Sequence, residues 1–428
     1  MLEILRSRDP DSVRRLNERL SQGKDGDTTV LVRDIVDAVR AGGDAALLDF
    51  TAQFDRITLK ASDLRVAPED VLTATIDPVA ASAMQRAADR IDAFHRHELL
   101  NDWWTVSVDG TLLGQRFLPI KSVGVYVPGG TAAYASSLLM NVIPARIASV
   151  RRIVVVTPPG PEGAIDPSIL VAARLCGIDE MYRIGGAQAI AALAYGTPSI
   201  PRVAKIVGPG NAYVAAAKRL VYGDVGIDTI AGPTEIAILA DASADPRLIA
   251  ADLIAQAEHD EDAFVLLVTT EPKLVSTVSA EIETQMPSLD RAATIRSALA
   301  DSMAVVTDDL TEAIDWVNRI APEHLELFVA DPLAVVPWIQ SAGVILCGPY
   351  SPAAICDYGI GPNHVLPTGG TGRFASALGV NDFLRRISIV SANREAFRVV
   401  ARDGIALAEI EGLTAHAAAL RIRLEESR

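Results

Sequence analysis

Four of the six histidines in this chain lie in four short stretches that are rich in polar residues. QAEH ends at His259, APEHLEL (residues 321–327) contains His324, SPAAICDYGIGPNHVLPT (351–368) contains His364, and EGLTAH ends at His416. The imidazole side chain both ligates metals and transfers protons near neutral pH. We interpret the four stretches as parts of one site.

Gln256 and His259 stand three residues apart near the end of a predicted helix. Their side chains leave such a helix on the same side, with Cβ atoms about 5–6 Å apart. This spacing suits a carbonyl oxygen and an imidazole nitrogen that bind one metal ion. Gln-x-x-His by itself is more often a solvated helix face, so the pair needs further donors.

Asp357 and His416 could supply those donors. Asp357 follows Cys356 in a loop rich in glycine and proline, where the backbone can direct a short carboxylate into a cleft. The alternative is an Asx turn that stabilises the loop locally. Together, Gln256, His259, Asp357 and His416 would form a set of borderline to hard donors, which favours zinc or manganese over copper or an iron–sulfur cluster.

Glu323 and His324 point to proton transfer. They follow Pro322 at a predicted turn between a helix and a strand, where both side chains can face one cavity. Their ordinary pKa values are about 4 and about 6.5, so either group could act as a general base. The alternative is a glutamate at a helix end beside a structural histidine.

The remaining reactive side chains carry weaker signals. His95 and His97 are two residues apart on a predicted helix and cannot share a face, so we expect both on the surface. Cys356 has no cationic neighbour or helix N-terminus in the sequence to form a thiolate, so we predict a buried structural thiol. The three cysteines are too few and too scattered for a disulfide framework, and we expect them to be reduced.

The elements that position these residues follow an α/β rhythm. From about residue 120, short β-rich runs alternate with helical segments: SVGVYV, RRIVVVT, MYRIGG and VAKIVG, and then EIAILAD, AFVLLVT, SMAVVTD, HLELFVA and VILCG. This predicts an α/β fold with two Rossmann-like parallel-sheet units, similar in size and separated by a cleft, and with helical N-terminal and C-terminal segments. Ligands of such sheets are expected outside the carboxyl ends of the strands.

We therefore predict four regions. Residues 1–112 form a mainly helical N-terminal region, 113–232 the first Rossmann-like domain, 233–380 the second, and 381–428 a helical C-terminal tail. The tail has too few apolar residues for a core of its own and should pack on something else, such as a second subunit. Its apolar residues are Val399, Val400, Ile405, Leu407 and Leu413.

Composition excludes several classes of partner. The 428 residues are half apolar and carry a formal net charge of −15, which argues against binding to nucleic acid or to an anionic membrane surface. Charges run through the first twenty residues, and no apolar run is long enough to span a membrane. We expect a cytoplasmic protein.

The chain resembles the histidinol dehydrogenase family. The motifs are QAEH, APEHLEL, DYGIGPNHVLPT and EGLTAH, with YVPGG (126–130), GGAQAIAALAYG, VGPGNAYV and AGPTE, and they extend from about Val30 to His416. The resemblance implies a zinc-containing, NAD-dependent enzyme that oxidises L-histidinol through L-histidinaldehyde to L-histidine, the last steps of histidine biosynthesis, and consumes two NAD. It also implies a homodimer in which Glu411 and His416 reach the neighbouring subunit's site.

The resemblance also assigns roles to residues. Zinc ligands fall on Gln256, His259, Asp357 and His416; the catalytic acid/base pair on Glu323 and His324; substrate contacts on Thr234, His324, His364, Glu411 and the zinc ligands; and NAD contacts on Tyr126, Gln188 and Asn211. Thr234 stands where the family usually has serine, which keeps the hydroxyl and adds a methyl group. No G-x-G-x-x-G follows a strand, since GPGN (208–211) does not qualify, so the NAD assignment depends on the resemblance.

Three other readings remain open. A zinc hydrolase could use the same ligands with Glu323 activating water, and it would turn over substrate without reducing NAD. A two-domain binding protein would have no need of the Glu323–His324 pair. A relative could oxidise another alcohol, although Glu411, His364 and His416 favour histidinol.

Overall fold

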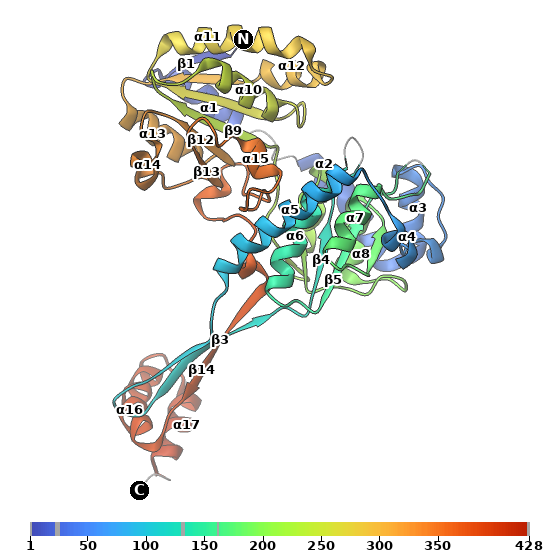
Figure 1. The fold of residues 1–428 in the computed structure, drawn as a ribbon. Coiled ribbons are helices and arrows are strands. Elements are labelled where there is room, and N and C mark those ends of the chain that lie inside the picture. The colour runs from blue at the N-terminus through green and yellow to red at the C-terminus, as the bar shows by residue number, and fades with distance from the viewer. Residues whose placement is uncertain (1, 22–25, 130–132, 161, 426–428) are drawn as a thin grey trace.

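The computed structural model describes residues 2–21, 26–129, 133–160 and 162–425. The chain forms two α/β units side by side and an arm that extends away from them (Figure 1). Gly130 of the YVPGG motif lies outside the described residues. No helix in the described part of the chain is long and apolar enough to cross a membrane.

The first unit is built on a five-stranded parallel sheet in the order β6-β5-β4-β7-β8. Val123 and Val125 face one core, whereas Val154 and Val156 face the other, so the central strands are buried on both sides and read as continuous apolar runs. The strands are β4 (Ser122–Tyr126), β5 (Arg152–Thr157), β6 (Met181–Arg183), β7 (Lys205–Val207) and β8 (Gly226–Ile227).

Helices cover both faces of this sheet, and they include helices from the N-terminal region. One core contains side chains from α2, α3, α8 and α9, and the other contains side chains from α5, α6 and α7. The helices are α2 (Gly26–Gly42), α3 (Asp44–Phe54), α4 (Pro68–Thr73), α5 (Pro78–His95), α6 (Ala135–Ile147), α7 (Pro167–Leu175), α8 (Gly186–Tyr195) and α9 (Ala212–Val221).

The second unit is a six-stranded parallel sheet in the order β1-β11-β10-β9-β12-β13. Its strands are β1 (Glu3–Arg6), β9 (Glu235–Ala240), β10 (Phe264–Thr269), β11 (Met303–Val306), β12 (His324–Phe328) and β13 (Val344–Cys347). Its helices are α1 (Pro10–Ser21), α10 (Pro246–Ala257), α11 (Pro272–Gln285), α12 (Ala292–Ala300), α13 (Leu310–Ile320), α14 (Pro332–Val335) and α15 (Ala353–Asp357).

The two units have the same strand topology. Numbered from the first strand of each unit, β4–β8 and β9–β13 both follow the 3-2-1-4-5 order of a Rossmann-type half. The second sheet differs by the addition of β1 at its edge. The prediction of two Rossmann-like units is confirmed, and the repeat is one of topology.

The arm is an antiparallel ribbon that ends in a helical hairpin. Strand β3 (Leu112–Pro119) pairs with β2 (Trp103–Val106) and with β14 (Leu384–Ser391). At its far end, α16 (Arg394–Ile410) packs against α17 (Thr414–Glu425) (Figure 1). The C-terminal segment is thus helical only after an eight-residue strand that its sequence did not predict. Val400, Leu407 and Ile410 of α16 are exposed, so the hairpin leaves apolar surface uncovered.

Candidate active site

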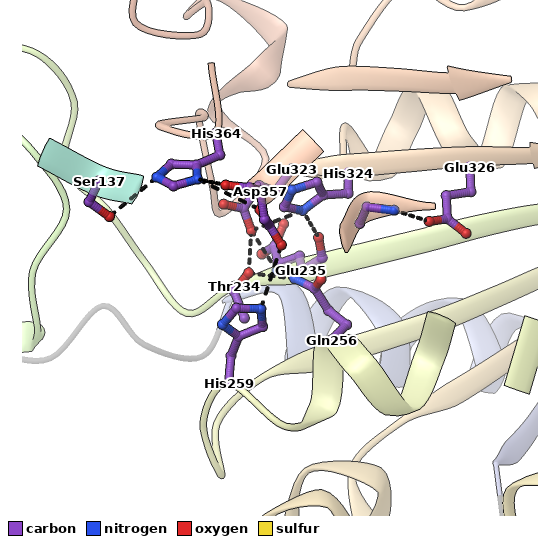
Figure 2. Close-up of polar contacts among 11 residues, drawn as sticks. Ser137, Thr234, Glu235, Gln256, His259, Glu323, His324, Glu326, Asp357 and His364 are labelled. Atoms are coloured by element: carbon purple, nitrogen blue, oxygen red, sulfur yellow. Dashed lines mark hydrogen bonds and ion pairs between the residues drawn. The ribbon is translucent and has the colours of Figure 1, made fainter. Parts of the chain in front are cut away.

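Most of the predicted site residues meet at the amino edge of the second sheet (Figure 2). Thr234 and Glu235 lie where β9 begins, and Glu323 and His324 lie where the neighbouring strand β12 begins. Ligands were expected at the carboxyl ends of the strands, and this expectation is wrong for this cluster. The reason is that α10 and α15 both end at the amino edge and carry their polar residues there.

Glu323 and His324 lie at the turn between α13 and β12, as predicted. Ala321 has a φ of 53° and ends α13 in the left-handed conformation, after which the chain turns into β12. Nδ1 of His324 lies 3.6 Å from Oε2 of Glu323 and 3.3 Å from the carbonyl oxygen of Glu235. Oε2 of Glu323 also accepts hydrogen bonds from the Thr234 hydroxyl at 2.6 Å and from the Glu235 N–H at 2.9 Å.

Burial and charge set the protonation of this pair. Burial opposes a charged imidazole, but the Glu323 carboxylate outweighs it and raises the pKa of His324 to about 9. Burial likewise opposes the Glu323 carboxylate, yet the His324 charge and the bonds from His324, Thr234 and Glu235 lower the pKa of Glu323. Nε2 of His324 is buried and has no hydrogen-bond partner among the described residues. It is therefore the atom placed to exchange a proton with a bound molecule.

Gln256, His259 and Asp357 approach the same region from two helices. Gln256 is buried near the end of α10 and donates a hydrogen bond of 2.5 Å to the Thr234 hydroxyl. His259 lies two residues beyond α10, with Nε2 3.9 Å from Oδ2 of Asp357. Asp357 is the last residue of α15, so a helix end directs its carboxylate, where the sequence had suggested a loop.

His364 joins the cluster through Asp357. Its Nδ1 donates to the backbone carbonyl oxygen of Asp357 at 3.1 Å, and its Nε2 lies 3.2 Å from the Ser137 hydroxyl. Burial lowers the pKa of His364, which favours a neutral ring that accepts from Ser137. Ser137 comes from α6 of the first unit, so this contact connects the two units. Nothing in the sequence around Ser137 had indicated it.

Glu411 and His416 do not reach the cluster within one chain. They lie in the helical hairpin at the far end of the arm, and both are exposed (Figure 1). Within the ranges that the structure describes, no group of three or more His, Cys, Asp or Glu side chains is close enough to hold a metal ion. The predicted fourth ligand, His416, thus lies away from Gln256, His259 and Asp357 within one chain (Figure 1).

The predicted NAD contacts lie at the carboxyl edge of the first sheet. Tyr126 ends β4, and Asn211 follows the adjacent strand β7 and caps α9. The strand order reverses between β4 and β7, which is where such sheets bind ligands. The Tyr126 hydroxyl accepts from the Gly186 N–H at 3.1 Å, and Gln188 is buried with both amide atoms unpartnered among the described residues.

Comparisons with known proteins identify the family. A sequence model described as histidinol dehydrogenase matches residues 18–424. The chain belongs to the histidinol dehydrogenase family. Curated histidinol dehydrogenases from Syntrophotalea carbinolica and Rhizobium meliloti are 49% and 50% identical over 399 and 401 residues. These matches cover 92% and 93% of this chain and 92% of each relative.

The fold is also that of a histidinol dehydrogenase. The crystal structure of histidinol dehydrogenase from Elizabethkingia anophelis is 33% identical, with a TM-score of 0.93 over 99% of this chain and 98% of that one. The agreement extends over both α/β units and the arm, because almost the whole chain is superposed. The arm is therefore a feature that this chain shares with a solved histidinol dehydrogenase.

The donor set of this histidinol dehydrogenase family member fits zinc. The 3.9 Å between Nε2 of His259 and Oδ2 of Asp357 is too long for a hydrogen bond, but two ligands that are each about 2.0–2.2 Å from one zinc ion can be that far apart. Gln256 lies in the same cluster (Figure 2), where it is hydrogen-bonded to Thr234. These three residues could hold the ion from one chain.

Two weaker predictions had opposite outcomes. Cys356 is fully buried, and burial raises the pKa of its thiol to about 12, so the structural reading is confirmed. His95 was expected on the surface, and this was wrong: it is fully buried, with Nδ1 3.0 Å from Oε2 of Glu98. Its Nε2 lies 3.5 Å from the amide nitrogen of Asn363, the residue before His364. His97 is exposed, as expected.

Proposed function

We propose that this protein oxidises L-histidinol to L-histidine through L-histidinaldehyde, with zinc and two molecules of NAD. The observation that carries the proposal is the buried Glu323–His324 pair beside Gln256, His259 and Asp357 (Figure 2) in a member of the histidinol dehydrogenase family. Nε2 of His324 has no hydrogen-bond partner among the residues that the structure describes. An alcohol oxidation needs such a proton acceptor beside the reacting carbon.

Substrate binding would use the polar groups around this pair. Gln256, His259 and Asp357, with His416 from a second subunit, would hold zinc, which when bound supplies a Lewis acid for the imidazole and amino nitrogens of histidinol. Thr234, His364 and Glu411 would complete the contacts to the substrate. The ring of His364 is held in this position by Asp357 on one nitrogen and by Ser137 on the other.

His324 would be the base in the first oxidation. In its deprotonated form, which becomes more abundant as pH rises towards the pKa of about 9, Nε2 accepts the hydroxyl proton of histidinol as the carbon releases a hydride. The carbon–oxygen bond then becomes that of the aldehyde. NAD, when bound, supplies the hydride acceptor. Glu323 stabilises the imidazolium that forms, because its carboxylate lies 3.6 Å from Nδ1. His324 then returns its proton to solvent.

Glu323 and His324 would act in different steps of the second oxidation. The carboxylate of Glu323 accepts a proton from water while the water oxygen attacks the aldehyde carbon. The former aldehyde oxygen takes up a proton from solvent, which gives the hydrate, and Glu323 later releases its proton to solvent. His324 then accepts a hydroxyl proton of the hydrate as the same carbon releases the second hydride. The product is the carboxylic acid, which ionises to L-histidine. A positioned general base typically accelerates such a step by about 10²–10⁴-fold.

A cytoplasmic homodimer with shared sites completes the proposal. Val400, Leu407 and Ile410 of α16 are exposed and apolar, so they are suited to packing against a neighbouring subunit. The arm would carry Glu411 and His416 to that subunit. NAD would bind at Tyr126, Gln188 and Asn211, where the strand order of the first sheet reverses.

The test is to incubate purified protein with L-histidinol and NAD and to count the NADH formed for each histidine. The expected ratio is two, with activity lost on chelation and restored by zinc. His324→Gln is the matched control for contaminating dehydrogenases and should be inactive. Zinc-loaded protein that forms no NADH, or that turns over histidinol without NADH, would refute the proposal.

A further inference from the structure

Two carboxyl groups lie directly behind the candidate site. Glu326 is two residues beyond His324 in β12, so the two side chains point to the same face of the strand. Asp252 is one turn before Gln256 in α10, so these two share a face of the helix. Each carboxyl group therefore lies on the same face as a site residue but farther from the amino edge of the sheet.

Glu326 is held in this position by contacts to two further elements, α15 and α10. It is 1% exposed, and its Oε1 accepts a hydrogen bond of 2.7 Å from the backbone N–H of Ala353, the first residue of α15 (Figure 2). Its Oε2 is buried, and no ordinary donor in the described part of the chain reaches it. The carboxyl group of Asp252 lies close enough to interact with Glu326 directly.

A hydrogen bond between two carboxyl groups requires a proton on one of them. Burial raises the pKa of Asp252 to about 6, and burial together with the Asp252 charge raises the pKa of Glu326 well above its usual value. The other charged group that acts on Glu326 is His324 of its own strand. Two ionised carboxylates in this place would repel each other, whereas one shared proton gives a strong charge-assisted hydrogen bond.

We propose that Asp252 and Glu326 share one proton and serve as positioning residues for the zinc and proton-transfer groups. The shared proton joins α10 to β12, and the Ala353 N–H joins β12 to α15. These three elements carry Gln256, His324 and Asp357. The pair holds them in register without touching substrate or metal. This inference rests on the proposed function.

Three variants separate this role from simple packing. Glu326→Gln keeps an oxygen acceptor for Ala353 and supplies a permanent N–H donor to Asp252, so it mimics the protonated acid. Glu326→Ala removes both bonds. Glu283→Gln makes the same charge change at an exposed position of α11 and is the control. For each, zinc affinity is measured by chelator competition, and kcat and KM are measured with histidinol.

Glu326→Ala should bind zinc about 10- to 100-fold more weakly, the loss typical when a group that orients metal ligands is removed. Its kcat should fall with little change in the KM for NAD, whose proposed site lies in the other unit. Glu326→Gln should recover most of both properties. If Glu326→Ala does not fold, Asp252→Ala replaces it. This variant keeps the hydrogen bond from Ala353 to Glu326 and removes only the interaction between the two carboxyl groups.

Two results would overturn the inference. One is an alanine variant that matches the wild type in zinc affinity and kcat. The other is a folded Glu326→Gln variant as impaired as the alanine variants, because a neutral hydrogen-bonding group would then not suffice. Failure of the proposed function would look different, since the wild-type protein itself would form no NADH from histidinol.

Discussion

The hydroxyl group of Thr234 donates a hydrogen bond of 2.6 Å to Oε2 of Glu323. The Thr234 hydroxyl oxygen also accepts a hydrogen bond of 2.5 Å from the side-chain amide of Gln256. One hydroxyl therefore orients a proposed zinc ligand and a proposed base at the same time. Because serine has the same hydroxyl, either serine or threonine at position 234 would preserve this arrangement.

Two replacements of Thr234 should distinguish the contribution of its hydroxyl group from that of its methyl group. Thr234→Val keeps the shape but removes one of the bonds that lower the pKa of Glu323, and it leaves the buried amide of Gln256 without this acceptor. We expect kcat to fall by about 10- to 100-fold, equivalent to the roughly 1–3 kcal/mol of one unsatisfied buried polar group. Thr234→Ser is the matched control and should stay within about threefold of wild type. Equal activity of the two variants would show that the hydroxyl is not needed.

The strands of the two sheets could be predicted because both of their faces are buried. Runs such as VGVYV and FVLLVT are continuously apolar, and they became β4 and β10. Strand β14 gave no such signal, since LRRISIVS packs in a thin ribbon with most residues exposed. Strand β2 is exposed throughout, so it too lacks the alternation that marks a half-buried strand.

Site residues could be predicted where their types and spacing in the sequence indicate a reaction. They could not be predicted where their role depends on packing between distant segments. Glu323 and His324 stood next to each other in the sequence. Ser137 and Glu326 were missed, although Glu326 could have been found from its spacing of two from His324 in a strand. His95 is buried because α5 packs against the loop around Gly359, where the Arg90 guanidinium donates to the Gly359 carbonyl oxygen at 2.6 Å.

The His324 imidazole should titrate far above an ordinary histidine in metal-free protein. Loss of its proton would leave the buried Glu323 carboxylate without its charged partner, so the pKa is raised to about 9. Glu323→Gln removes that charge but not the burial, and the pKa of His324 should fall. NMR titration of the ring protons, assigned with His324→Gln, measures both values. A wild-type midpoint near the ordinary 6.5 would contradict the ion pair.

The same pair makes stability depend on pH. The folded pKa of His324 is raised, so its contribution is complete below 6.5 and is lost as pH rises through about 9. The folded pKa of Glu323 is lowered, so its contribution is complete above 4.5 and is lost as pH falls. Urea unfolding of metal-free protein should therefore show a loss of stability between pH 6.5 and 9 that is smaller in Glu323→Gln. An equal loss in both proteins would count against the pair.

Variants of the two proton acceptors should affect the two oxidations differently. Glu323→Gln removes the base that activates water, so the oxidation of supplied histidinaldehyde should be damaged more than the oxidation of histidinol to the aldehyde. His324→Gln should damage both steps. Each half-reaction is followed by NADH formation in single-turnover experiments. If Glu323→Gln oxidised histidinaldehyde at the wild-type rate, the proposed role of Glu323 would be wrong.

Hybrid dimers should test whether the arm serves the neighbouring site. His324 lies in the second α/β unit, whereas His416 lies at the far end of the arm, so His324→Ala and His416→Ala damage different parts of one shared site. Each variant alone should be inactive. When equal amounts exchange subunits, half of the dimers are hybrids, and each hybrid has one site with both histidines intact. Activity should return to about a quarter of wild type. Differently tagged chains prove the exchange by co-purification, and exchange without recovered activity would mean that the tail does not act on the partner.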